Sequence, residues 1–234
     1  MAVYAISDLH LAISVNKPMD IFGGRWKNYM ERLKYQWDSI VNEKDYVIIP
    51  GDISWATYLE EGVADFRFID TLPGKKIISK GNHDYWWTTN NKLQLFLQKN
   101  SFETISFMHN NSYDLGSVLL CGTRGWSTPG DENFTEEDRK IYNREIQRLE
   151  LSLMSIPERQ GKSVIVALHY PPFNAHGQST EFINLIRKYE VTYCIYGHLH
   201  SEAAKNAIEG NVDGVEYKMV SSDHLSFKPL LLFE

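Results

Sequence analysis

The stretch "YCIYGHLH" (residues 193–200) joins a short apolar run to two histidines. Residues 193–196 are apolar or aromatic and precede a glycine, which is typical of a buried strand that ends there. If the chain remains extended, the alternation of side chains places His198 and His200 on the same face. The stretch therefore predicts a strand whose end presents two imidazole groups on one side.

Five more runs of this kind alternate with helical segments along the chain. The other predicted strands are "VYAIS" (3–7), "YVIIP" (46–50), "KIIS" (76–79), "SVLLCG" (117–122) and "SVIVAL" (163–168). Apolar residues at helical spacing predict helices over 26–43, 58–71, 135–154 and 182–189. This alternation predicts an α/β fold with a largely parallel sheet. The later strand-like runs "GVEYKMV" and "PLLLF" predict a mixed sheet, or two stacked sheets with helices outside.

Three segments carry more specific expectations. Residues 107–122 predict antiparallel hairpin strands joined by an Asn-Asn turn. The helix over 135–154 starts with Thr135 as its N-cap and Asp138 as the partner in a capping box. Its charged residues form either a solvated face or a cap over a substrate. Residues 11–25, which contain two adjacent glycines, predict a loop that is either a lid or a passive insertion.

The composition predicts one folded domain over residues 1–234. Hydrophobic residues make up 43% of the chain and charged residues 23%, which is ordinary for a globular protein. The formal net charge of −6 argues against nucleic acid as the main partner, because proteins that bind it usually carry a basic surface.

The two cysteines and the absence of targeting features predict a cytoplasmic protein. Cys121 and Cys194 lie in strand-like runs without metal-binding spacing, so we expect both to be core residues in a reducing compartment. The first residues do not resemble a signal peptide, and no stretch reaches the roughly 20 apolar residues of a membrane span. We therefore expect no membrane partner.

Five of the predicted strands are followed by Asp, Asn or His. These residues are Asp8 and His10, Asp52, Asn82 with His83 and Asp84, His169, and His198 with His200. Open α/β sheets place their functional sites at the carboxyl ends of the strands. The sequence therefore predicts one site built from five strand ends.

The side chains at these ends are typical ligands of divalent cations. The seven candidate ligands are Asp8, His10, Asp52, Asn82, His169, His198 and His200. The mixed oxygen and nitrogen donors suit Mn, Fe, Co, Ni or Zn, of which we favour Mn, and no cysteine suggests a closed structural zinc site. Seven ligands are too many for one ion and suit two ions about 3.5 to 4 Å apart. Asp52 is the natural bridge between them.

The ordered motifs D-x-H, G-D, G-N-H-D, H and G-H-x-H resemble the signature of the calcineurin-like metallophosphoesterases and extend from residue 8 to residue 200. The resemblance implies a four-layer αββα sandwich, with two mixed β-sheets flanked by helices. It also implies two cation sites that share Asp52. One site uses Asp8, His10, Asp52 and His200, and the other uses Asp52, Asn82, His169 and His198.

The resemblance further implies a phosphohydrolase with a dinuclear centre. A hydroxide that bridges the metals would attack phosphorus in line, and Asn82 would also contact the substrate. His83 would assist the leaving group, with Asp84 orienting its ring.

Two positions depart from the protein phosphatases of this family. In those enzymes the second motif continues with an Asp and an Arg, and an Arg precedes the G-N-H motif. Here Trp55 and Lys80 occupy those places, which makes a phosphoprotein substrate less favoured. Arg124, just beyond a strand, is either a substitute that grips phosphate or a surface arginine that covers the sheet edge.

Several aromatic and histidine residues have two interpretations. The "YWW" run at 85–87, Trp55 and Trp126 either stack on a planar leaving group or pack in the core. The remaining histidines are His109, His176 and His224, which we expect to be structural, although His176 is close enough to "HYPPF" to line the pocket.

The sequence thus predicts a metal-dependent enzyme that hydrolyses a phosphodiester or a small phosphomonoester. Two alternatives remain, a nuclease and a non-catalytic interaction module on the same fold. The oligomeric state and the physiological substrate do not follow from the sequence.

Overall fold

The strands form two sheets in the computed structural model, which describes residues 1–17 and 19–234. The first sheet has the order β11-β1-β2-β3-β4, and the second has the order β5-β6-β7-β8-β10-β9. The bounds are β1 Val3–Ala5, β2 Tyr46–Pro50, β3 Lys75–Ser79, β4 Ile105–Phe107, β5 Tyr113–Asp114, β6 Val118–Thr123, β7 Ser163–Leu168, β8 Tyr193–Tyr196, β9 Gly210–Val212, β10 Val215–Met219 and β11 Leu230–Phe233. All six runs that we predicted from apolar character are confirmed as strands.

Both sheets are mixed, with parallel centres. Strands β1 to β4 pair in parallel, and β11 is antiparallel to β1. Strands β6, β7, β8 and β10 pair in parallel, and the edge strands β5 and β9 are antiparallel to their neighbours. The carboxyl ends of the parallel strands therefore lie on one edge of each sheet.

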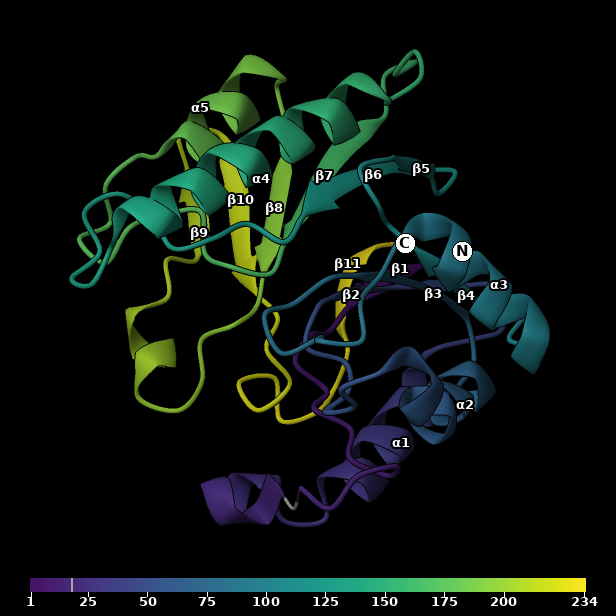
Figure 1. Ribbon diagram of the computed structural model, residues 1–234. Coiled ribbons are helices and arrows are strands. Elements are labelled where there is room, and N and C mark those ends of the chain that lie inside the picture. Colours follow the sequence, from purple (N-terminus) through teal and green to yellow (C-terminus); the bar gives the residue numbers. More distant parts are fainter. Residues whose placement is uncertain (18) are drawn as a thin grey trace.

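Helices cover the outer face of each sheet (Figure 1). Their bounds are α1 Tyr29–Ile40, α2 Val63–Thr71, α3 Asn90–Asn100, α4 Glu136–Met154 and α5 Glu181–Lys188, with 3-10 helices at Met19–Phe22, Gly24–Trp26, Leu59–Gly62 and Ala203–Asn206. Helices α1, α2 and α3 accompany the first sheet, and α4 and α5 accompany the second. None of the described helices is long and apolar enough to cross a membrane.

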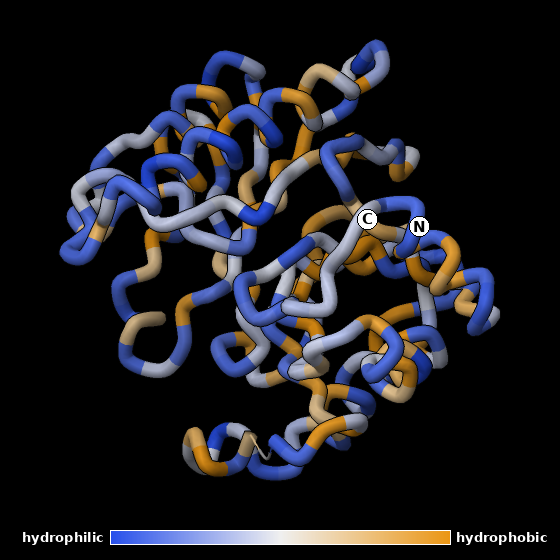
Figure 2. Tube along the Cα trace, in the orientation of Figure 1, coloured by the Kyte–Doolittle hydropathy of each residue, from blue (hydrophilic) through white to orange (hydrophobic). Residues whose placement is uncertain are grey.

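Alternating side chains along the strands divide the core into three apolar layers. On β7, Val164 and Val166 pack toward the helices, whereas Ile165 and Ala167 pack between the two sheets. On β2, Ile48 likewise faces the space between the sheets. Figure 2 shows apolar residues along the strands in the middle of the molecule, whereas most residues of α4 are hydrophilic. Three core layers between four layers of structure confirm the predicted αββα sandwich.

The capping box and the buried cysteines of the second half agree with the sequence analysis. The Thr135 side chain accepts a hydrogen bond from the Asp138 amide, and the Asp138 carboxylate accepts one from the Thr135 amide. Cys121 and Cys194 are both buried and free, and burial raises the pKa of both thiols. Helix α4 is one layer of the sandwich, and exposed pairs such as Lys140 with Glu137 show that its outer face is solvated.

The predicted hairpin with an Asn-Asn turn is wrong. Strand β4 pairs with β3 in the first sheet, whereas β5 pairs with β6 in the second. Residues 108–112 therefore cross from one sheet to the other, and the hairpin turn lies at 115–117. Met108 and Leu115 are buried between the sheets, which holds this crossing in place.

Two helices also differ from expectation. The predicted helix over 58–71 is divided at Gly62 into a 3-10 turn and α2. Helix α3 was not predicted, because its sequence is polar and starts with two asparagines. It is stabilised by Leu93, Phe96 and Leu97, which pack into the core of the first sheet.

Candidate metal centre

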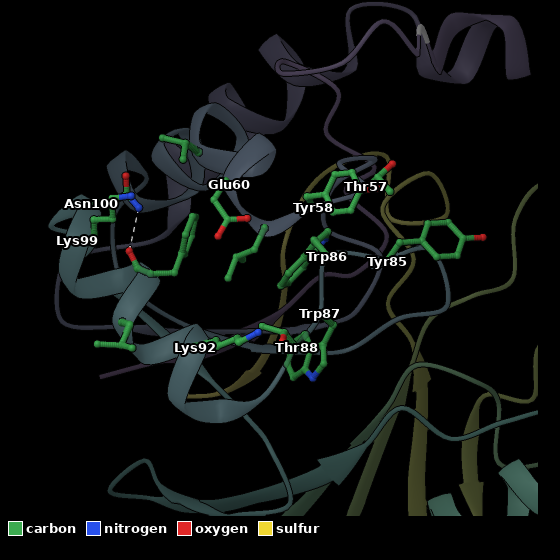
Figure 3. A pocket seen from close by; sticks show the side chains of 14 residues that line it. Thr57, Tyr58, Glu60, Tyr85, Trp86, Trp87, Thr88, Lys92, Lys99 and Asn100 are labelled. Atoms are coloured by element: carbon green, nitrogen blue, oxygen red, sulfur yellow. Dashed lines mark hydrogen bonds between the residues drawn. The ribbon is translucent and has the colours of Figure 1, made fainter.

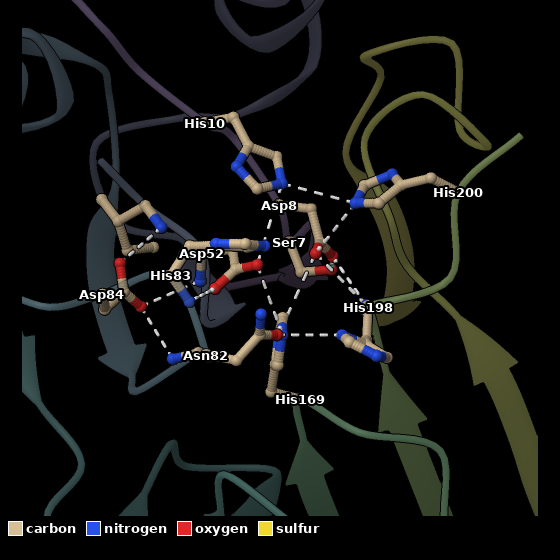
Figure 4. Close-up of polar contacts among 12 residues, drawn as sticks. Ser7, Asp8, His10, Asp52, Asn82, His83, Asp84, His169, His198 and His200 are labelled. Atoms are coloured by element: carbon tan, nitrogen blue, oxygen red, sulfur yellow. Dashed lines mark hydrogen bonds and ion pairs between the residues drawn. The ribbon is translucent and has the colours of Figure 1, made fainter. Parts of the chain in front are cut away.

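The carboxyl edges of the two sheets meet through backbone hydrogen bonds between the segments that follow β1 and β10. The Ser7 amide donates to the carbonyl of Val220 at 2.7 Å, and the Ser222 amide donates to the carbonyl of Ser7 at 3.0 Å. The side chains that follow β1, β2, β3, β7 and β8 are thereby brought to one place. Figure 4 shows all seven predicted ligands directed toward a common centre.

One group of donors surrounds the carboxamide oxygen of Asn82. This oxygen lies 2.7 Å from His169 Nε2 and 2.9 Å from His198 Nδ1. His169 Nε2 is also 3.4 Å from Asp52 Oδ2. These four residues are the second ligand set that the family resemblance implies.

A second group surrounds Asp8 and His200. The Nε2 atoms of His10 and His200 are 3.3 Å apart, and His200 Nε2 is 3.4 Å from Asp8 Oδ1. His10 Nε2 is 3.8 Å from Asp52 Oδ2, so the Asp52 carboxylate lies between the two groups. Asp8 Oδ1 is also 4.0 Å from His169 Nδ1. The Asp8 carboxylate therefore lies next to both groups.

The backbone adopts uncommon conformations at these positions. The φ angles of Asp8, His10, Asp52 and His198 are +57°, +45°, +53° and +71°. Residues other than glycine seldom adopt the left-handed region, and such strain concentrates at functional sites.

Glycines in the motifs allow the loops to approach the carboxylates. A Cβ atom on Gly81 would lie 2.1 Å from Asp52 Oδ1, and one on Gly197 would lie 2.3 Å from Asp8 Oδ2. Any side chain at these two positions would displace a carboxylate of the centre. The glycines of the G-N-H-D and G-H-x-H motifs are therefore required by close packing.

Asp84 does not have the position that we predicted for it. Its carboxylate accepts hydrogen bonds from the backbone amides of Gly81, Asp52 and Ile53, at 2.7 to 2.9 Å, and from Trp86 Nε1 at 3.1 Å. None of these bonds reaches the ring of His83. Because the carboxylate is buried and fully engaged, it joins the loops after β2 and β3 instead of orienting His83.

His83 lies beside the centre and is only half buried. Its ring centroid is 5.7 Å from that of His10 and 4.6 Å from that of Trp55. The backbone amide of His83 donates to Asp52 Oδ1 at 2.8 Å. Its Nδ1 atom is buried and has no hydrogen-bond partner in the described part of the chain.

The sequence analysis missed Asp223, which supports a predicted ligand. Asp223 Oδ1 lies 2.7 Å from His200 Nδ1 and so orients the ring with Nε2 toward the centre. Asp223 follows β10, and the rule that polar residues after a strand end build the site would have identified it. Two further residues contact predicted ligands. Ser222 Oγ donates to the Asp8 carbonyl at 2.6 Å, and the centroid of the Tyr170 ring lies 4.1 Å from that of the His198 ring.

Burial controls the protonation of three of the four predicted imidazole ligands. It lowers the pKa of His10 and His198 to about 3 and that of His169 to about 4, so these rings are neutral near pH 7. Burial alone would also lower the pKa of His200, but hydrogen bonds to Asp223 and Asp8 raise it to about 10. Neutral imidazole is the form that binds a metal ion.

The carboxylates at the centre are crowded. Burial, together with the charges of Asp84 and Asp8, raises the pKa of Asp52 to about 9. Burial likewise raises the pKa of Asp84 to about 6. Asp8 differs, because despite burial the hydrogen bond from His200 and the nearby imidazoles lower its pKa. Asp52 and Asp84 therefore lack sufficient positive charge from the surrounding residues, and divalent cations would supply it. Carboxylate, carboxamide and imidazole donors at these distances fit such cations.

Arg124 is not a surface arginine. Its side chain is 11% exposed, donates to Glu145 Oε1 at 3.1 Å and lies 4.3 Å from the centre of the Trp126 ring. Lys80, which precedes Gly81, is partly buried nearby. Contact of Arg124 with a substrate remains a prediction.

The aromatic residues near the centre have different environments. Trp55 stacks on the His10 ring at 5.0 Å, whereas Trp86 is buried and packs on Phe66 at 4.9 Å. Trp86 and Trp87 line a cavity of about 650 Å³ beside α3 (Figure 3). Core packing therefore accounts for Trp86, while Trp55 lies against a predicted ligand.

Within residues 11–25, Lys17 and Met19 contact the Trp55 ring beside the centre, whereas Ile21 and Phe22 are exposed. The neighbouring Trp26 is buried and packs against the rings of His10 and His200, with centroids 5.8 and 5.9 Å apart. Whether this loop acts as a lid remains a prediction, and residue 18 lies outside the described residues. The three histidines that we expected to be structural, His109, His176 and His224, lie outside the cluster of predicted ligands.

Comparisons with known proteins identify one family. A model of the family described as calcineurin-like phosphoesterase matches residues 1–202. No curated protein gives a significant match.

Solved structures show the same fold at low sequence identity. A phosphopantetheinyl hydrolase from Mycobacterium tuberculosis is 13% identical with a TM-score of 0.60, covering 99% of this chain and 95% of that one. The protein TT1561 of Thermus thermophilus is 14% identical with a TM-score of 0.53, covering 99% and 97%. A protein of unknown function, AQ665 from Aquifex aeolicus, is 16% identical with a TM-score of 0.52, covering 98% and 95%.

Proposed function

The chain belongs to the calcineurin-like phosphoesterase family. We propose that it is a hydrolase of a phosphate ester and that its seven predicted ligands hold two divalent cations. The observation that carries the proposal is the convergence of donors from five strand ends around Asp52, with separations of 2.7 to 4.0 Å. The left-handed backbone at four of these positions supports a functional origin for the arrangement.

The two donor groups suggest how the ligands divide. Asp8, His10 and His200 would hold one cation, and Asn82, His169 and His198 would hold the other, with Asp52 between them. When bound, the cations would supply the charge that makes hydroxide available from water and that neutralises the phosphoryl oxygens.

The remaining residues would position the ligands and assist the leaving group. Asp223 holds the His200 ring in orientation, and Asp84 holds the loops that carry Asp52 and Asn82. His83 would donate a proton or a hydrogen bond to the leaving oxygen, since its ring lies beside the centre and is partly accessible. Asn82 would also contact the phosphoryl group.

We propose a phosphodiester or a small phosphomonoester as the substrate. Trp55 lies against His10 and occupies a place where the protein phosphatases of the family have a different residue. This departure disfavours a phosphoprotein substrate. The net charge of −6 disfavours nucleic acid.

Metal-dependent turnover tests this function directly. We expect the purified protein, loaded separately with Mn, Fe, Co, Ni or Zn, to hydrolyse an aryl phosphate or a bis-aryl phosphate. Asp52→Asn should lose turnover and bound cation together, because Asp52 would contact both ions. Asp38→Asn, the same change at an exposed ion pair on α1, should retain both.

Two outcomes would contradict the proposal. Full occupancy by cations without turnover of either ester would favour the non-catalytic interaction module. Cleavage of plasmid DNA at a higher rate than either aryl ester would favour the nuclease.

A further inference from the structure

A separate cavity lies at the carboxyl ends of β3 and β6, beside the metal centre. Its volume is about 470 Å³, and none of the seven predicted ligands lines it. Lys80, Arg124 and Arg148 contribute cationic groups to its wall, and Glu145 contributes the one carboxylate among the described lining residues. The wall therefore carries more positive than negative charge.

Glu145 cannot neutralise all three cations. Its Oε1 atom accepts from Arg124 at 3.1 Å and from Arg148 at 2.7 Å, and its Oε2 atom accepts from Thr123 Oγ1 at 2.6 Å. This buried carboxylate is thus fully engaged, but it offsets only one positive charge. Lys80 has no ion pair within 4.0 Å among residues 1–17 and 19–234.

The same wall has polar atoms without partners. Arg124 Nε and Ser79 Oγ are buried, and neither makes a hydrogen bond to any described residue. These two atoms are inaccessible from the cavity, so only the charge of its wall favours a bound anion. Excess positive charge is the feature of a site for an anion.

The cavity and the metal centre are directly connected through the chain. Lys80 is two residues before Asn82, and two extended residues span at most about 7 Å. The Arg124 carbonyl accepts from the amides of His169 and Tyr170, both at 2.9 Å. The cavity therefore lies close to the metal centre.

We propose that the cavity binds a second anionic group of the substrate, so that the enzyme prefers phosphate esters that carry two separated negative groups. This inference rests on the proposed function and narrows its substrate class.

Binding of inorganic phosphate to the metal-free protein tests the cavity without relying on activity. Comparison of the wild type with Arg148→Gln assigns the binding to the cavity, because Arg148 lines the cavity and is not a predicted metal ligand. Titration calorimetry should show saturable binding that weakens with added salt. Arg148→Gln should weaken it by about tenfold or more, since a charge-assisted hydrogen bond is lost.

The matched control is Arg144→Gln. Arg144 is exposed on the same helix, does not line the cavity, and undergoes the same change of charge. It should leave phosphate affinity unchanged. Absence of phosphate binding to the wild-type protein, or equal affinity in Arg148→Gln and the wild type, would overturn the proposal.

Kinetics of the metal-loaded enzyme distinguish a substrate group from a free effector. A series of α,ω-alkanediol bisphosphates should have lower KM values than the matching alkyl monophosphates, with an optimum chain length. Arg148→Gln should remove this advantage, and Arg144→Gln should retain it. If free phosphate instead raises kcat for the monophosphates without competing with the bisphosphates, the cavity is an effector site and the proposal is wrong.

If no ester is hydrolysed, the proposed function fails, while the phosphate titration still decides whether the cavity binds an anion.

Discussion

A single carboxylate, Asp84, joins the loops that carry two of the predicted ligands. Its oxygens accept from amides on both sides of the contact, at Asp52 and Ile53 after β2 and at Gly81 after β3. The family resemblance implies that Asp84 orients the neighbouring His83. The hydrogen bonds instead indicate that Asp84 positions the two loops.

Asp84→Asn should therefore weaken both folding and metal binding. An amide group would direct N–H donors at backbone N–H donors, so we expect a loss of about 2–4 kcal/mol in the free energy of unfolding. Urea unfolding and the affinity for Mn measure the two effects. A variant with unchanged stability and metal affinity, but lower turnover, would restore the role of orienting His83.

His83→Gln should affect turnover alone. Loss of a group that assists the leaving oxygen lowers kcat by about 10²–10⁴-fold. Elemental analysis should show an unchanged metal content, because His83 is outside the predicted ligand sets. His176→Gln, at an exposed histidine, should keep wild-type turnover. Loss of cations from His83→Gln would mean that this residue is a ligand.

At the scale of elements, one buried lysine holds the end of α2. Lys76 on β3 is fully buried, and its ammonium group donates to the carbonyls of Asp70, Leu72 and Gly74. Burial lowers its pKa to about 8, so the side chain is still mainly protonated at pH 7. The lysine thus satisfies buried carbonyls at the end of the helix and just beyond it.

Lys76→Met should destabilise the fold without changing the site. Carbonyls would lose their buried donor, and we expect the free energy of unfolding to fall by about 2–4 kcal/mol. Urea unfolding measures this change. Lys75→Met, at the exposed neighbour, should cost less than about 0.5 kcal/mol. Equal stability of the two variants would show that Lys76 contributes only apolar packing.

At the scale of the molecule, the two sheets share one apolar layer and one polar edge. Val3, Ala5 and Ile48 of the first sheet pack with Ile165 and other residues of the second. This shared layer supports the prediction of one domain over residues 1–234. Calorimetry of the chelated protein should show one unfolding transition. Two separate transitions would mean that the sheets unfold independently.

Bound cations should stabilise the whole fold. They would compensate the buried carboxylates, and a cation at 1,000 times its Kd adds about 4 kcal/mol. Chelation should then lower Tm by about 8–16 °C for a domain of this size. Scanning calorimetry with and without EDTA measures the shift. An unchanged Tm after the cations are shown to be removed would contradict a centre inside the folded core.

Much of this protein was determined by local sequence. Apolar runs such as 46–50 and 163–168 form strands because buried strands need little more than short apolar segments between turn residues. Asp52 and His169 could be identified because each directly follows such a run, and parallel strands end at a common edge. The capping box at Thr135 is equally local, since its partners are three residues apart.

The tertiary structure alone decided which distant groups meet. It placed β4 and β5 in different sheets and gave α3 its apolar partners. It also paired Asp84 with a loop more than 30 residues away, and it brought Asp223 to His200 and Glu145 to Arg124. Each of these contacts depends on side chains that are far apart in the chain. Spacing along a sequence reports which face of an element a residue occupies, whereas the partner on that face is selected only when the layers pack together.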